Sequence, residues 1–174
     1  MRIFLISLMA LILTACSKPH DKYLGYWKLE ESKFTRILEI KKEDKETYLV
    51  NENILREADL VGNKKKEQVL EKKEDQLGVN NGLTVIPFNL SDDGKVLRIK
   101  DQKYSKISED EAKSTVKNTK DCRELAKQFI DEKKPFDGLF FSPNNINPNQ
   151  AKLDAVKTKY SDLQKKIPEC DFKI

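Results

Sequence analysis

Short runs of alternating apolar and polar residues recur along residues 23–107, which is the pattern of half-buried β-strands. The runs follow one another at about the 8–12 residue spacing that is typical of sandwiches and barrels. This pattern predicts about eight or nine short antiparallel strands, each with one dry and one wet face, in a small barrel or a curled sheet. The predicted strands are Leu24–Leu29, Phe34–Ile40, Thr47–Ile54, Ala58–Val61, Gln68–Lys72, Leu77–Val79, Leu83–Leu90, Val96–Lys100 and Lys103–Ile107.

Turn residues separate several of these runs. Asn81-Gly82 is a strong hairpin signal, because both residue types tolerate a positive φ. Asp93-Gly94 gives the same signal before the next strand. Pro87 lacks a backbone N–H, so it predicts an edge position or a bulge in its strand.

The apolar period changes to that of helices after residue 107. Ser108 and Glu111 form a capping-box pattern, which predicts a helix that runs to about Asn118 and is poor in apolar residues. A second helix is expected over 120–133, and a third after a cap at Asn147, with Pro148 at its first position. The third helix has one apolar face, formed by Leu153, Val156, Tyr160, Leu163 and Ile167. The predicted fold class is therefore α+β, with a β region over 23–107 and a helical region over 108–174.

An apolar run opens the chain and follows the positive Arg2. It extends over Ile3–Leu13, which is shorter than the ~20 residues that cross a bilayer and fits the apolar core of a signal peptide. It ends in Leu13-Thr14-Ala15-Cys16, which resembles the lipobox of bacterial lipoproteins. The resemblance implies cleavage after residue 15, acylation of Cys16, and a lipidated tether over 16–22. An ordinary secretory signal or a buried helix is the alternative.

The expected cellular location and the net charge of the mature chain limit the classes of molecule that it could bind. By the same resemblance, Ser17 after the acylated cysteine implies an outer-membrane lipoprotein that faces the periplasm. Removal of residues 1–15 leaves 159 residues with a net charge of +3, and opposite charges are mixed along them. A nucleic-acid interface needs a clustered basic patch, so no nucleic-acid partner is expected.

Assignment of Cys16 to the lipid leaves two of the three cysteines. In an oxidising periplasm Cys122 and Cys170 should pair, since they fall at the start of the second predicted helix and just after the third. The bridge would clamp the open end of a helical hairpin; two reduced, buried thiols are the alternative. The single histidine, His20, falls in the tether, so histidine-dependent catalysis and most zinc sites are not expected in the folded part. No catalytic residue, metal site or cofactor is predicted.

The sequence Gly25-Tyr26-Trp27 resembles the G-x-W at the start of lipocalin-like barrels. In that family the tryptophan plugs the closed end of the barrel and an arginine near the last strands packs over it. The resemblance implies these roles for Trp27 and Arg98, and an interior that could hold a small apolar ligand. A core tryptophan in any small barrel is the alternative.

A cluster of large apolar residues lies between the second and third predicted helices. It consists of Phe136, Leu139, Phe140 and Phe141. Docking of the helices onto the sheet would explain it, and so would a projecting loop that binds a partner, since exposed apolar patches mark interaction sites. The opposite face of the third helix is rich in lysine, which is consistent with a solvated face or with contact to anionic lipid headgroups.

Three functions from different classes remain. The leading hypothesis is a lipid-anchored, non-enzymatic module that binds a protein partner, and an immunity protein against a periplasm-acting toxin is one specific form of it. The second is a lipocalin-like carrier of a small apolar or lipid ligand. The third is an enzyme that uses carboxylates alone, which would require two close carboxylates in a cleft.

Overall fold

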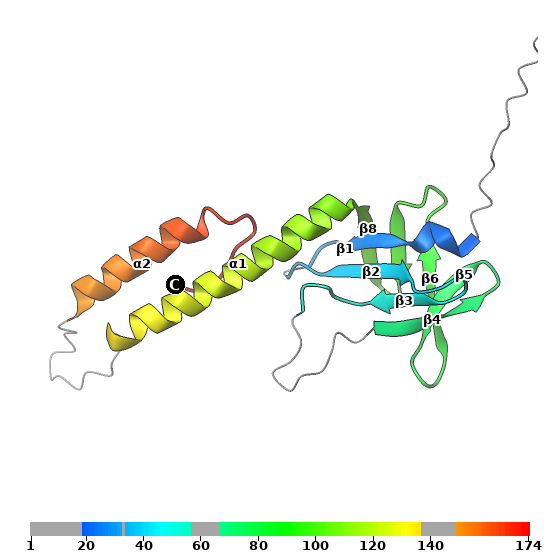
Figure 1. Ribbon diagram of the computed structural model, residues 1–174, viewed down its shortest axis with the longest axis horizontal. Coiled ribbons are helices and arrows are strands. Elements are labelled where there is room, and N and C mark those ends of the chain that lie inside the picture. The colour runs from blue at the N-terminus through cyan, green and yellow to red at the C-terminus, as the bar shows by residue number, and fades with distance from the viewer. Residues whose placement is uncertain (1–18, 33, 57–66, 137–148) are drawn as a thin grey trace, which may run out of the picture.

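The computed structural model describes residues 19–32, 34–56, 67–136 and 149–174, and it combines a β-barrel with a helical hairpin (Figure 1). The elongated molecule has the barrel at one end and the hairpin at the other. The barrel is preceded by a short 3-10 helix, η1. The elements are η1 (Pro19–Tyr23), β1 (Gly25–Leu29), β2 (Ile37–Lys42), β3 (Tyr48–Asn51), β4 (Glu67–Lys73), β5 (Gln76–Asn80), β6 (Val85–Leu90), β7 (Val96–Ile99), β8 (Gln102–Ile107), α1 (Glu109–Lys133), η2 (Lys134–Phe136) and α2 (Gln150–Gln164).

The eight strands form a closed antiparallel barrel in which each strand pairs with the next along the chain. Pairing of β1 with β8 completes the circle, and places Trp27 opposite Leu38 on one side and Lys106 on the other. The prediction of a small antiparallel barrel with a helical region after it is therefore confirmed. The strand predicted over 58–61 lies outside the described residues.

Turn chemistry at the predicted hairpins is also confirmed. Gly82 and Gly94 have φ values of 89° and 68°, which a residue with a Cβ rarely adopts. Asn81 Oδ1 accepts hydrogen bonds from the backbone N–H groups of Leu83 and Thr84, which fixes the β5–β6 turn. Asp93 has the same role in the β6–β7 turn, where its carboxylate accepts the N–H of Lys95.

Pro87 lies within β6, and a closed barrel has no edge strand for it to occupy. It pairs with Gly78 of β5, whereas the register of β6 with β7 begins one residue later, at Phe88. Pro87 is thus paired with a neighbouring strand on one side only, as a residue in an edge strand would be. Gly78 has no room for a side chain, since a Cβ there would lie 2.7 Å from the carbonyl oxygen of Ile86.

Residues after the barrel form one long helix, so the predicted break near residue 118 is wrong. α1 is continuous over Glu109–Lys133, and the Ser108 side chain caps its start by accepting the N–H of Glu111. The polar stretch stays helical because it contains no glycine or proline and because side chains one turn apart pair, as Lys117 does with Asp121 at 2.5 Å. α2 begins at Gln150; the predicted cap Asn147 and Pro148 lie outside the described residues.

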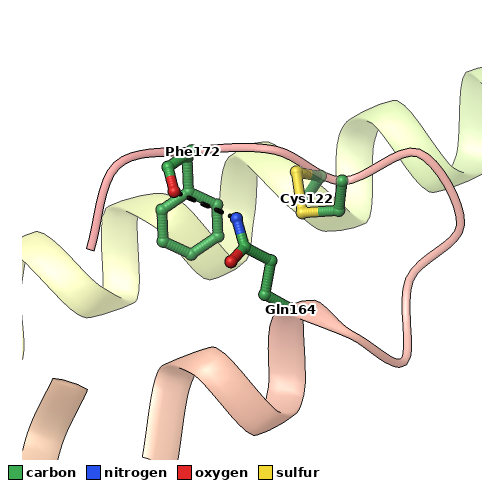
Figure 2. The surroundings of a disulfide bond; sticks show 4 residues. Cys122, Gln164 and Phe172 are labelled. Carbon is green, nitrogen blue, oxygen red and sulfur yellow. Dashed lines mark hydrogen bonds between the residues drawn. A yellow bond between two sulfur atoms is a disulfide. The ribbon is translucent and has the colours of Figure 1, made fainter. Parts of the chain in front are cut away.

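The hairpin has a hydrophobic core of its own, in which Leu125 and Phe129 of α1 meet Val156 and Tyr160 of α2. The predicted Cys122–Cys170 disulfide is present, with its Cα atoms 5.4 Å apart (Figure 2). Because α1 is a single helix, Cys122 lies near its middle rather than at its start. The bridge therefore ties the segment after α2 to the middle of α1, beside a hydrogen bond from the Gln164 side chain to the Phe172 carbonyl.

Candidate functional site

The start of β1 lies at a barrel end that η1 closes. Trp27 is fully buried, and its indole Nε1 donates to the carbonyl of Tyr23 at 3.0 Å. Tyr23 is itself buried in the same cluster of side chains. Trp27 thus lies at the closed end, where the resemblance to lipocalins places it.

The cation over the Trp27 ring is Lys106, and the expectation that Arg98 fills this role is wrong. Lys106 Nζ lies 5.1 Å from the centre of the indole ring, and it also donates to the carbonyl of Lys22. Arg98 is exposed, on the outer face of β7. The reason is register: Lys106 is directly opposite Trp27 across the β1–β8 pair and shares its inward face.

Residues 19–22 belong to the folded barrel, which corrects the prediction that they form part of a tether. Asp21 is the central contact: its carboxylate accepts the Tyr48 hydroxyl at 2.6 Å and pairs with Lys42 Nζ at 2.6 Å. Burial raises the pKa of Tyr48, and its hydrogen bond to Asp21 raises it further. Two lysine ammonium groups also lie near the Tyr48 ring. Lys42 Nζ is 5.3 Å and Lys72 Nζ is 5.4 Å from the ring centre.

His20 is also part of this end of the barrel, although the sequence predicts that it lies in the tether. The residue is about 9% exposed, and its Nε2 lies 2.9 Å from the carbonyl oxygen of Glu74 in the β4–β5 turn. The ring also packs at a tilt against Tyr48. These contacts give His20 a role in fastening η1 to the barrel. Proline at the first position of η1 is the signal that could have revealed this short helix.

The barrel interior is occupied by its own side chains. The inward-facing residues of all eight strands join Tyr23 in one cluster, whose buried members are each no more than 3% exposed. Eight strands enclose a space that is just filled by side chains or just holds one small ligand. The observed packing corresponds to the filled case. The buried cluster comprises Tyr23, Trp27, Leu38, Ile40, Tyr48, Val50, Leu70, Leu77, Phe88, Leu97 and Tyr104.

Among the described residues, Arg123 and Glu169 link the hairpin to the barrel, and neither link is predicted from the sequence. Arg123 of α1 donates through Nη2 to the Leu55 carbonyl at 2.7 Å. Glu169, next to the disulfide, pairs with Lys28 of β1 at 3.0 Å and accepts the Thr35 hydroxyl. The pKa of Glu169 is lowered, chiefly by its hydrogen bond to Lys28.

The start of α1 packs on the outside of the barrel, where Ala112 joins Ile37 and Leu55 in a small buried cluster. Beyond this cluster and the contacts of Arg123 and Glu169, the hairpin extends away from the strands (Figure 1).

Part of the predicted partner loop can be placed. Phe136, in η2, is partly buried against the hairpin core, with Lys152 Nζ 5.9 Å from its ring centre. Leu139, Phe140 and Phe141 lie outside the described residues. On α1 itself, Ile130 is 56% exposed, which makes it the large apolar side chain that the described part of the hairpin presents most openly.

Within the described ranges, no three histidine, cysteine or acidic side chains gather as a metal site would require. No helix in the same ranges is both long and apolar enough to cross a membrane. No protein family, curated protein or solved structure matched the chain in the comparisons made.

Proposed function

We propose that this chain is a lipid-anchored, non-enzymatic lipoprotein of the outer membrane that faces the periplasm and binds a protein partner through its helical hairpin. The filled barrel carries the proposal, because a barrel packed with its own side chains serves as a support rather than as a container. The hairpin has a separate core and a separate disulfide, so it can present a rigid surface away from the barrel. Rigid elements bind partners with little loss of conformational freedom.

The anchor is tested by Cys16→Ser. The variant should carry no acyl chains and should leave the membrane fraction. Stable membrane attachment needs at least two signals, such as two acyl chains or one chain and a basic patch, and the variant would lack the acyl chains. Firm membrane association of the Cys16→Ser protein would contradict the lipobox interpretation. Mass spectrometry of the wild-type N-terminal peptide provides the matching positive measurement.

The binding surface is tested by photo-crosslinking in living cells. A photoreactive amino acid replaces Ile130 on α1, and the matched control replaces Val69 on β4, which is similarly exposed at 61%. We expect one discrete crosslinked partner from position 130 and none from position 69. The purified partner should then bind the wild-type protein more tightly than the Ile130→Lys variant. Equal crosslinking from both positions would argue against the hairpin as the binding surface.

The immunity form of the proposal has its own test. Cells that lack the gene are grown in contact with the parent strain, and their survival is counted. Killing of the deletion strain, with rescue by the wild-type gene, would support protection against a delivered toxin. Equal survival of both strains would leave the binding module without this specific role.

The lipocalin-like carrier is the second candidate, since the closed eight-strand barrel and the position of Trp27 agree with it. Mass spectrometry under native conditions distinguishes the two. A stoichiometric small apolar or lipid molecule, retained by a soluble form that begins at Ser17, would favour the carrier. Mass equal to that of the chain alone would favour the binding module.

A further inference from the structure

The way η1 is fastened to the barrel bears on how the protein sits on its membrane. Five contacts hold this helix. The Trp27 indole and the Lys106 ammonium group donate to the carbonyls of its last two residues. Lys42 and Tyr48 bind the Asp21 carboxylate, and the His20 ring contacts the backbone of the β4–β5 turn. They leave η1 little freedom to swing relative to the strands. Residues 19–23 therefore belong to the rigid body of the protein.

The distance from the lipid to this rigid body is short. Cys16 and Pro19 are three residues apart in the chain, so their Cα atoms can be separated by no more than roughly 11 Å. Proposed acylation at Cys16 would place the lipid headgroups within that distance of η1. The η1 end of the barrel is therefore the part of the described molecule that the anchor holds nearest to the bilayer.

We infer that the η1-closed end of the barrel, with the β2–β3, β4–β5 and β6–β7 turns, is the surface that rests on the lipid headgroups, and that the hairpin is held away from the membrane. This inference rests on the proposed acylation of Cys16. The alternating strand directions place these three turns at the same end as η1. In Figure 1, η1 and α2 lie toward opposite ends of the long axis.

The net charge of this end of the barrel determines whether it favours anionic or zwitterionic lipid. Residues 20–23, 42–46, 72–75 and 91–95 together with Lys106 carry seven lysines and eight carboxylates. A surface with balanced charge gains little from anionic lipid. Contact is therefore imposed by the short connection to the anchor, and zwitterionic phosphatidylcholine should serve as well as an anionic lipid.

The lysine-rich face of α2 is the competing membrane-binding surface. Two of its lysines are already paired, Lys159 with Glu132 at 2.7 Å and Lys165 with Asp162 at 3.1 Å. α1 has 25 residues and is about 37 Å long, so α2 lies far from the anchored end along the molecule. The distance places this face away from the headgroups, and the two ion pairs leave it less positive charge with which to bind them.

The test uses the full acylated protein in phosphatidylcholine vesicles that contain a headgroup-attached nitroxide quencher. A fluorophore is attached to a single introduced thiol, Lys45→Cys in the β2–β3 turn or Ala155→Cys on α2, both at exposed positions. We expect several-fold stronger quenching at position 45 than at position 155, with no change on addition of anionic lipid or salt. Equal quenching, or stronger quenching at 155, would overturn the inferred orientation.

A lengthened connection provides the matched control. About twelve Gly/Ser residues inserted after Ser17 span roughly 19 Å as a flexible coil and should reduce the quenching at position 45. Unchanged quenching would show that the barrel end binds lipid by itself, and would overturn the inference that the short connection imposes the contact. Flotation of each sample with the vesicles separates the two proposals: protein that stays in solution refutes the anchor together with the orientation, whereas protein that floats with the wrong quenching pattern refutes the orientation alone.

Discussion

Loss of the Cys122–Cys170 disulfide should destabilise the hairpin far more than the barrel. The bridge joins residues 48 positions apart, and for a loop of that size the chain-entropy relation gives about 4 kcal/mol at 25 °C. The loop contains the second half of α1, all of α2 and the segment that packs beside them. The free energy of unfolding of this part should therefore fall by about 4 kcal/mol in the Cys122→Ser/Cys170→Ser variant.

Two spectroscopic signals separate the two parts of the molecule. Trp27 is the single tryptophan and lies in the barrel, so its fluorescence follows the barrel. Far-UV circular dichroism is dominated by the helices. With a typical urea dependence of ~2 kcal/mol per molar, the helical transition should move down by ~2 M.

The expected result is a helical transition that precedes the tryptophan transition in the variant. Wild-type protein treated with dithiothreitol is the chemical control and should show the same separation. Coincident transitions at the wild-type midpoint would refute the reasoning. Transitions that move together to lower urea would instead show that Arg123 and Glu169 couple the hairpin to the barrel strongly enough for joint unfolding.

Three further predictions concern the barrel and its buried groups. Gly78→Ala should lower the free energy of unfolding, measured in urea, by about 1–3 kcal/mol, because the added methyl would lie 2.6 Å from a Val85 side-chain carbon; unchanged stability would contradict this packing. Lys106→Ala should shift the Trp27 emission and Arg98→Ala should not, so equal shifts would refute Lys106 as the cation over the ring. In an alkaline absorbance titration all five tyrosines should ionise above their ordinary pKa, because burial raises the pKa of each. The stability that the buried, protonated tyrosines contribute is complete below about pH 10 and is lost as the pH rises through their pKa values in the folded protein. Tyrosines that ionise normally in the native protein would contradict this.

Strand positions and faces could be predicted because the signal for them is local. Ile86, Phe88 and Leu90 reveal an inward face by their spacing alone, and Asn81-Gly82 marks a turn by its conformational tolerance. Closure of the sheet could not be predicted in the same way. It depends on pairing of β1 with β8, whose residues are distant in sequence and carry no short-range signal for each other.

The errors at the barrel end have the same origin. The resemblance to lipocalins points to Arg98, but the β1–β8 register puts Lys106 opposite Trp27. η1 was missed because five residues are too few to show a period, and the stability of such a short turn comes from contacts to remote partners such as Tyr48. The disulfide was predictable because the assignment of Cys16 to a lipid leaves only Cys122 and Cys170 to pair.

Closure of the barrel also sets an order of events during folding. Seven of the eight strand pairs join neighbours in the chain and can zip up one after another, whereas β1 meets β8 only across the whole of residues 25–107. Loop-closure entropy makes such a long-range pair the slow one. Trp27 sits in that pair, so burial of its indole, followed in a stopped-flow refolding experiment, times the moment at which the barrel becomes complete. The first strand of the chain is thus the last to find both of its neighbours.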